Sequence, residues 1–341
     1  MKQKTLNTLA VVFNNEQKIC YSPGNVVAGR VLLQLSAPTK VEAIEVLVKG
    51  CARVRWPDKL SQCSQQRNLL SLSKTLAAAT GTQDLILDCG FHEFPFKLEL
   101  PQTPLVSSFI GKHGCVYYMA QAVLKLPHHK NQCVSRRLFI ISHTDVNIPA
   151  LTSPVSQTCE KMIGRWIFTS GPISLTVSID RKGYCNGESI PISAEIKNGS
   201  SCLVVPKAAM YQIQTYMANG KRKIFKHKVA SARGNIVPSH FSDRWSGNVF
   251  MIPPVCPSIL NSDILKVEYR LAVIVQISGT KNLKVEFPIV IGTIPYRGPP
   301  PSGCFSISSY SSADMSFLTP RLPDEAPPSY ADVVASEDPL Y

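Results

Sequence analysis

Apolar side chains alternate with polar or small ones along much of this chain. After a turn at Pro23-Gly24, residues 27–35 have apolar side chains at nearly every second position. Residues 94–100 have the same period, with Phe94, Phe96, Leu98 and Leu100 on one side. A strand that packs on one face has this period of two. Further strand-like segments cover residues 41–49, 85–87, 115–124, 137–142, 190–196 and 264–275. The pattern predicts an all-β protein.

One stretch departs from this alternation. Residues 58–79 are polar at first and then rich in leucine and alanine. This composition is compatible with a loop that contains a short helix, so we expect an insertion in this region, at about residues 57–84.

The same order of signals occurs twice along the chain. Tyr21 is followed three residues later by Gly24 and then by an alternating segment, and Tyr184 and Gly187 begin a second such segment. Later parts of the two copies lie at 98–101 with 116–124, and at 251–254 with 264–275. Two copies of one strand order indicate two similar β-sandwiches in tandem.

A proline-containing segment separates the two copies. Residues 145–154 include Pro149 and Pro154 and are typical of a linker between domains. After Gly292 the strand pattern ends, and a run of prolines follows at 299–301. We therefore expect an N-terminal sandwich at 6–144, a linker at 145–165, a C-terminal sandwich at 166–294 and a disordered tail at 295–341.

The composition is typical of a protein with packed cores and gives no sign of a metal site, a secretory signal or a membrane span. The 341 residues are 44% hydrophobic, which is ample for two domains. The eleven cysteines are scattered, with no C-x-x-C pair and no zinc-ligand spacing, so they indicate reduced thiols in a cytoplasmic protein, with no metal and no cofactor. The N-terminus lacks the pattern of a secretory signal, and no run approaches the ~18 apolar residues of a membrane span.

Charge is distributed unevenly. The formal net charge is +13, yet the residues from Pro299 onward carry six acids and one base, so the body carries +18. Such a body suits anionic membrane surfaces or acidic protein segments. Nucleic acid is not expected as a partner, because aromatic residues are not interleaved with the basic runs.

The densest basic run follows a predicted hairpin turn at Asn219-Gly220, since Asn-Gly suits a type I′ turn. A solvated, lysine-protected strand is one interpretation. A contact with phosphoinositides or acidic cargo is the other, and nuclear import is a smaller alternative. The residues concerned are Lys221, Arg222, Lys223, Lys226 and Lys228.

A short motif near the end of the chain indicates a partner. Pro327 and Pro328 are followed by one spacer and then Tyr330. Consecutive prolines favour an exposed polyproline II helix, in which Pro327 and Tyr330 lie on the same side. WW domains bind such Pro-Pro-x-Tyr ligands in aromatic-lined grooves. The motif therefore predicts a WW-domain partner, and a chance occurrence in an acidic tail is the alternative. Pro339 and Tyr341 form a possible second motif that lacks its first proline.

Several turns and strand edges resemble those of one family. The chain resembles the α-arrestins, the arrestin-domain-containing proteins, over nearly its whole length. The most specific segments are residues 29–31, 100–105, 170–175, 181–184, 205–209, 257–260, 267–269 and 288–292, together with 325–330.

The resemblance implies a non-enzymatic adaptor with two arrestin-like sandwiches. Members of this family engage membrane cargo such as receptors and transporters. Their Pro-Pro-x-Tyr motifs recruit Nedd4-class HECT ubiquitin ligases, and the cargo is then ubiquitinated and internalised. It also implies a cytoplasmic protein that is recruited to the plasma membrane and endosomes.

The chain departs from the family pattern at two places. Family tails usually carry a second complete Pro-Pro-x-Tyr motif, whereas the second motif here lacks its first proline. Two motifs that bind tandem WW domains together can raise the affinity by ~10²-fold or more. A thioredoxin-binding member of the family uses a cysteine where Ser242 stands here, and a hydroxyl cannot form a mixed disulfide. A thioredoxin-binding redox regulator remains the alternative function. It predicts an exposed, low-pKa thiol, with Cys63 and Cys256 as the candidates.

An enzyme is a third hypothesis with little support. The histidines show no metal spacing and no visible triad, and glycine-rich phosphate loops are absent from the sequence. We therefore expect no catalytic residues.

Overall fold

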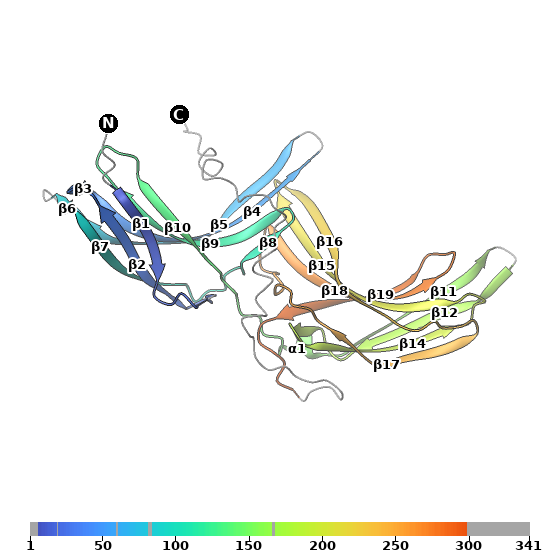
Figure 1. The fold of residues 1–341 in the computed structure, drawn as a ribbon. Coiled ribbons are helices and arrows are strands. Elements are labelled where there is room, and N and C mark those ends of the chain that lie inside the picture. The colour runs from blue at the N-terminus through green and yellow to red at the C-terminus, as the bar shows by residue number, and fades with distance from the viewer. Residues whose placement is uncertain (1–5, 19, 59–60, 81–83, 166–167, 299–341) are drawn as a thin grey trace.

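The computed structural model describes residues 6–18, 20–58, 61–80, 84–165 and 168–298, and strands make up nearly all of its regular structure there (Figure 1). The helix α1 (Pro149–Thr152) is a single turn between the two halves. Strands of the first half are β1 Leu6–Phe13, β2 Val26–Leu35, β3 Thr39–Val41, β4 Ala43–Pro57, β5 Gln62–Ala78, β6 Leu85–Leu87, β7 Gly90–Glu99, β8 Phe109–Gly111, β9 Gly114–Lys125 and β10 Gln132–Leu138. Strands of the second half are β11 Val155–Arg165, β12 Phe168–Ile179, β13 Gly183–Cys185, β14 Ser189–Asn198, β15 Val204–Ala218, β16 Lys221–Arg233, β17 Phe241–Met251, β18 Leu265–Ile277 and β19 Leu283–Gly292.

Each half is a sandwich of two sheets. In the first half a sheet of order β1-β2-β7 packs on a sheet of order β10-β9-β4-β5, and β8 pairs with β9. In the second half the orders are β11-β12-β14-β17 and β13-β19-β18-β15-β16. The series β1-β2-β7 therefore recurs as β12-β14-β17, and β10-β9-β4-β5 recurs as β19-β18-β15-β16. This confirms the predicted tandem of two β-sandwiches.

The repeated turns that suggested two copies adopt the same conformation. Gly24 and Gly187 have positive φ values of 76° and 78°. Glycine tolerates this left-handed backbone because it has no Cβ. Tyr21 and Tyr184, three residues earlier in each copy, are both buried. Each turn thus leads from a buried tyrosine into the central strand of a sheet.

Two segments differ from what the sequence predicts. Residues 62–78 form strand β5, which pairs along the whole of β4, in place of the expected loop and helix. Its leucines alternate imperfectly because bulges shift the register of the pair. Residues 155–165 of the expected linker form strand β11, which pairs with β12. Polar side chains mask this edge strand in the sequence, and only residues 145–154 connect the two sandwiches.

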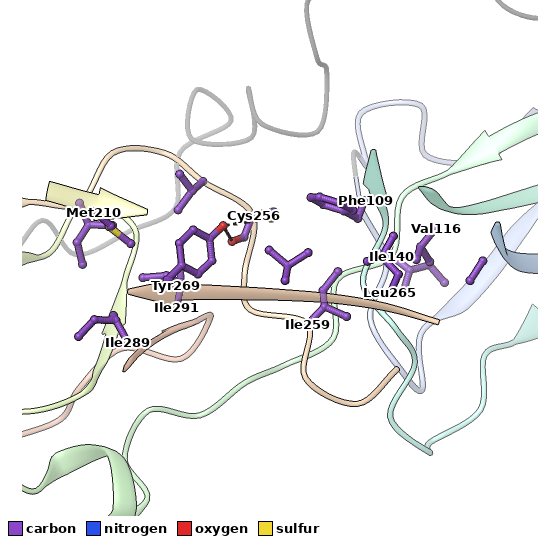
Figure 2. Packing of buried hydrophobic residues seen from close by; sticks show 14 of the residues in the cluster. Phe109, Val116, Ile140, Met210, Cys256, Ile259, Leu265, Tyr269, Ile289 and Ile291 are labelled. Carbon is purple, nitrogen blue, oxygen red and sulfur yellow. Dashed lines mark hydrogen bonds between the residues drawn. The ribbon is translucent and has the colours of Figure 1, made fainter. Parts of the chain in front are cut away.

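The buried core continues from one sandwich into the other. Ile259 and Leu265 of the second sandwich belong to the same buried cluster as Phe109, Val116 and Ile140 of the first (Figure 2). Full burial of a large aliphatic or aromatic side chain stabilises the fold by roughly 1.5–3 kcal/mol. The contact between the sandwiches is thus an extension of their hydrophobic cores.

Candidate functional site

The predicted WW-binding residues lie outside the described part of the chain. This applies to Pro327, Pro328 and Tyr330, and to Pro339 and Tyr341 of the possible second motif. The described chain ends at Gly298. The structure therefore shows where the tail leaves the body, and the motif itself rests on the sequence.

The chain that leads into the tail is fixed to the connector between the sandwiches. The Asn147 side-chain amide donates to the Pro295 carbonyl oxygen at 2.9 Å, and its oxygen accepts from the Arg297 backbone N–H at 2.8 Å. Thr144 and Thr293 also exchange hydrogen bonds. The tail therefore begins at the junction of the two sandwiches.

A buried arginine holds the same segment from the other side. The Arg181 guanidinium lies 4.5 Å from the centroids of the Tyr184 and Tyr296 rings. It also pairs with Asp180 at 3.5 Å and Glu188 at 3.4 Å. Cation–π contacts of a buried arginine are worth roughly 1–2 kcal/mol each. Tyr296, at the start of the expected tail of residues 295–341, is thus clamped to the C-terminal sandwich.

The basic run on β16 does not form one continuous patch. Side chains of a strand alternate between faces, so Arg222, Lys226 and Lys228 lie on the face opposite to Lys221 and Lys223. Lys221 pairs with Asp58 of the N-terminal sandwich at 2.5 Å, and this hydrogen bond raises the pKa of the lysine. The five basic residues of the predicted patch are therefore divided between the two faces of β16.

Other basic residues join the outer face of the C-terminal sheet, and the sequence-based analysis missed them. Lys207 lies opposite Arg233 in the β15–β16 ladder, and Arg270 lies opposite Tyr211 in the β15–β18 ladder. Lys284 on β19 lies opposite Ile274, which in turn lies opposite Lys207, so it is on the same face. The period of two in β15 and β18 was visible in the sequence, but the pairing that aligns these side chains comes from the fold.

Hairpin tips of the two sandwiches meet at the domain interface, in the middle of Figure 1. The Asn219 backbone N–H donates to the Gln65 side-chain oxygen at 3.0 Å. Arg67 of β5 pairs with Asp263 at 2.9 Å, with both side chains exposed. Exposed ion pairs contribute roughly 0–1 kcal/mol each. These contacts therefore set the register of the two tips more than they stabilise them.

Below the tips, a histidine–aromatic cluster fills the interface. The ring centroids of His113 and Tyr216 lie 5.5 Å apart in an edge-to-face arrangement, and Lys112 lies 4.5 Å from the centroid of the Phe225 ring. Burial, together with the charges of Lys223 and Lys112, lowers the pKa of His113. The cluster thus favours a neutral histidine.

A chain of buried polar groups runs inward from this cluster. The Lys112 backbone N–H donates to the Gln214 side-chain oxygen at 3.3 Å, and the Gln214 amide donates to Gln212 at 2.6 Å. Gln212 donates to the Tyr269 hydroxyl at 2.7 Å, which donates to the Cys256 carbonyl oxygen at 2.6 Å. These neutral hydrogen bonds connect the core of the C-terminal sandwich to the β8–β9 turn.

The candidate redox thiols are not accessible. Burial raises the pKa of Cys256 to about 12, and its sulfur faces Tyr269 inside the core (Figure 2). Cys63 of β5 is 4% exposed and lies opposite Trp56 in the β4–β5 hairpin. Ser242 lies exposed on β17. Neither candidate therefore supplies the exposed thiol that the thioredoxin-binding alternative requires, because both side chains are buried.

Within the described residues, no group of three or more His, Cys, Asp or Glu side chains could hold a metal ion. In the same part of the chain, no helix is long and apolar enough to cross a membrane.

Comparison with known proteins agrees with the two-sandwich architecture. The family model "Arrestin (or S-antigen), N-terminal domain" matches residues 9–147, and "Arrestin (or S-antigen), C-terminal domain" matches residues 169–296. The chain is 48% identical to human arrestin domain-containing protein 4, over 98% of this chain and 82% of that protein. It is 37% identical to human thioredoxin-interacting protein, over 98% of this chain and 86% of that protein. Both matches extend across the two sandwiches and into the tail.

Proposed function

Because this chain belongs to the arrestin family, with the α-arrestins as its relatives, we propose that it is an adaptor that links membrane cargo to a WW-domain ubiquitin ligase. The body engages cargo, and the tail engages the ligase. Neither role requires a catalytic group. The protein brings two partners together so that the ligase modifies the cargo.

The observation that carries this proposal is the Pro-Pro-x-Tyr motif on a chain tethered at the junction of the sandwiches. Pro327, Pro328 and Tyr330 follow the clamp formed by Asn147 and Arg181. WW domains recognise this motif through its preformed polyproline II geometry. Nedd4-class HECT ligases carry tandem WW domains, which makes them the partner class we propose.

Pro339 and Tyr341 form a second motif that lacks its first proline. We propose that this pair adds at most a weak contact beside Pro327, Pro328 and Tyr330.

The cargo side of the proposal rests on the charge of the body. Residues 1–298 carry a formal +18, and basic side chains lie on the outer face of the C-terminal sheet. Such a surface suits anionic lipid headgroups and acidic cytoplasmic segments. The corresponding location is the cytoplasm, with recruitment to the plasma membrane and endosomes.

The alternative function, thioredoxin binding, has less support. A relative with 37% identity bears the name thioredoxin-interacting protein. Disulfide exchange requires an accessible thiolate, whereas Cys63 and Cys256 are buried and Ser242 has no thiol. We therefore place ligase recruitment first.

A calorimetric titration tests the ligase side. The full-length chain is titrated with a tandem WW fragment of a Nedd4-class ligase, beside Tyr330→Ala and Tyr341→Ala variants. We expect micromolar binding by the wild type, loss of at least about tenfold with Tyr330→Ala, and little change with Tyr341→Ala. Equal binding by the wild type and Tyr330→Ala would refute the role of the motif.

A further inference from the structure

A shallow groove runs along β15 on the outer face of the C-terminal sheet. It consists of two hollows of about 480 and 430 Å³, which share Arg233, Gln276 and Asn282 in their walls. From Leu203 to Tyr211 the groove covers eight residue steps of strand, or about 26 Å at ~3.3 Å per residue. This is the length of an extended peptide of about eight residues.

Small side chains create the hollow at the basic end. Ala209 lies opposite Ser231 in the β15–β16 ladder, and both line the groove. The rows on either side carry long residues, with Lys207 and Arg233 on one side and Tyr211 on the other. A row of short side chains between rows of long ones leaves a depression in a sheet face.

Three cations on the rim lack carboxylate partners. Among the described residues, Lys207, Lys228 and Arg233 form no ion pair. Lys207 and Arg233 lie opposite each other in the β15–β16 ladder, so an anion bound beside them relieves their mutual repulsion. The basic end is therefore built to accept negative charge.

Neighbouring cations on the same face are already compensated. Lys226, Arg270 and Lys284 all pair with Glu286. Burial alone would raise the pKa of Glu286, but Lys284 and Lys226 outweigh it and lower that pKa. The contrast distinguishes the three rim cations from the rest of the basic face.

The other end of the groove is apolar. Leu203 is 55% exposed and Ile236 is 57% exposed, and both line the second hollow with Val205. Exposed aliphatic side chains next to a hollow favour a ligand with apolar groups of its own. A bare polyphosphate would leave this half of the groove unused.

We propose that this groove binds an extended peptide that carries carboxylates at one end and large aliphatic side chains at the other. The carboxylates lie among Lys207, Lys228 and Arg233, and the aliphatic side chains cover Leu203 and Ile236. The inference rests on the proposed function for the source of the peptide, which is the cytoplasmic segment of a membrane cargo protein. It names the chemistry of that cargo and is independent of the ligase.

The test measures peptide binding by the full-length chain with no ligase present. The probe is a fluorescein-labelled octapeptide with glutamates in one half and leucines in the other. Its fluorescence anisotropy measures binding to the chain. The first variant is a double substitution, Lys228→Glu with Arg233→Glu. The second carries Leu203→Ser alone. The matched control is Lys74→Glu with Lys97→Glu, which changes the charge equally at exposed positions of the N-terminal sandwich.

We expect the Lys228/Arg233 pair to weaken binding at least about tenfold, Leu203→Ser to weaken it several-fold, and the control pair to change it less than twofold. Tyr330→Ala should have no effect, so failure here is distinct from failure of the ligase proposal. If the Lys228/Arg233 variant and the Lys74/Lys97 control lose peptide affinity equally, the attraction is non-specific and the proposed site is refuted.

Two other outcomes would show that a different ligand occupies the groove. The first is tested with vesicles of phosphatidylcholine that contain a phosphatidylinositol bisphosphate. If they bind through Lys228 and Arg233 while Leu203→Ser has no effect on peptide or vesicles, a lipid surface is the ligand and the peptide is refuted. If the peptide binds only after removal of residues 299–341, the acidic tail of the chain itself occupies the groove.

Discussion

At the residue scale, a few buried polar groups determine how the two sandwiches are joined. Tyr269 is the centre of the neutral chain, because its hydroxyl accepts from Gln212 and donates to the Cys256 carbonyl oxygen. Each buried hydrogen bond contributes roughly 1 kcal/mol, and an unmatched partner costs more. The chain thus favours one arrangement of the C-terminal core against the β8–β9 turn.

Removal of this hydroxyl should therefore destabilise the protein. Tyr269→Phe leaves the Gln212 amide and the Cys256 carbonyl without their partner, so we expect a loss of about 1–3 kcal/mol in the free energy of unfolding. Urea denaturation followed by tryptophan fluorescence measures it. Tyr211→Phe on the half-exposed outer face is the control and should change stability by less than about 0.5 kcal/mol. Equal effects of the two substitutions would refute the hydrogen-bonded chain.

Two histidines should make the domain interface sensitive to pH. The pKa of His113 is lowered by burial and by Lys223 and Lys112, and burial lowers the pKa of His227. A depressed histidine pKa means that the folded state prefers the neutral ring. Its contribution to stability is therefore complete above the unfolded pKa of about 6.5 and is lost as pH falls through the folded value.

We expect a lower melting temperature at pH 5.5 than at pH 7.5, with a smaller difference in a His113→Gln variant. Differential scanning calorimetry at both pH values gives the comparison, and His92→Gln is the control, because His92 contacts the Asp88 carbonyl and the Phe94 ring within the N-terminal sandwich. A His113→Gln protein with an undiminished pH dependence would show that this ring does not titrate at the interface.

At the element scale, the β15–β16 hairpin has a turn whose residues match its backbone conformation. Asn219 and Gly220 have φ values of 51° and 74°, as a type I′ turn requires. A Cβ at Gly220 would meet no atom within 4 Å, so any cost of a side chain there arises from the backbone conformation.

Gly220→Ala should therefore cost about 1–2 kcal/mol, the penalty of an L-residue in the left-handed region. Asn219→Gly keeps the positive φ accessible and should stay within about 0.5 kcal/mol of the wild type. Thermal unfolding of the two variants distinguishes these effects. A neutral Gly220→Ala would indicate that the turn is not of this type.

Much of the architecture could be predicted from sequence, and the misses have physical causes. The period of two and the repeated Tyr-x-x-Gly turns identified two sandwiches because both are local signals. Strands β5 and β11 were missed because they are edge strands, whose polar faces and bulges hide the period. The alignment of Lys207 with Arg233 and the clamp of Arg181 on Tyr296 depend on pairing between distant segments, which no local pattern encodes.

At the scale of the whole molecule, the two halves form one body with one exit for the tail. Ion pairs at the hairpin tips, an aromatic cluster and a continuous hydrophobic core all join the sandwiches. The described chain ends close to their junction, where the Asn147 side chain holds Pro295 and Arg297.

The most direct test of the adaptor is whether the chain carries a ligase to membranes. Cells expressing the wild type or Tyr330→Ala are fractionated, and both the chain and a Nedd4-class ligase are quantified in the membrane fraction. We expect equal amounts of the two variants on membranes, with the ligase enriched only beside the wild type. Equal ligase enrichment with both variants would contradict it, because the tail motif would then play no part in bringing the ligase to cargo.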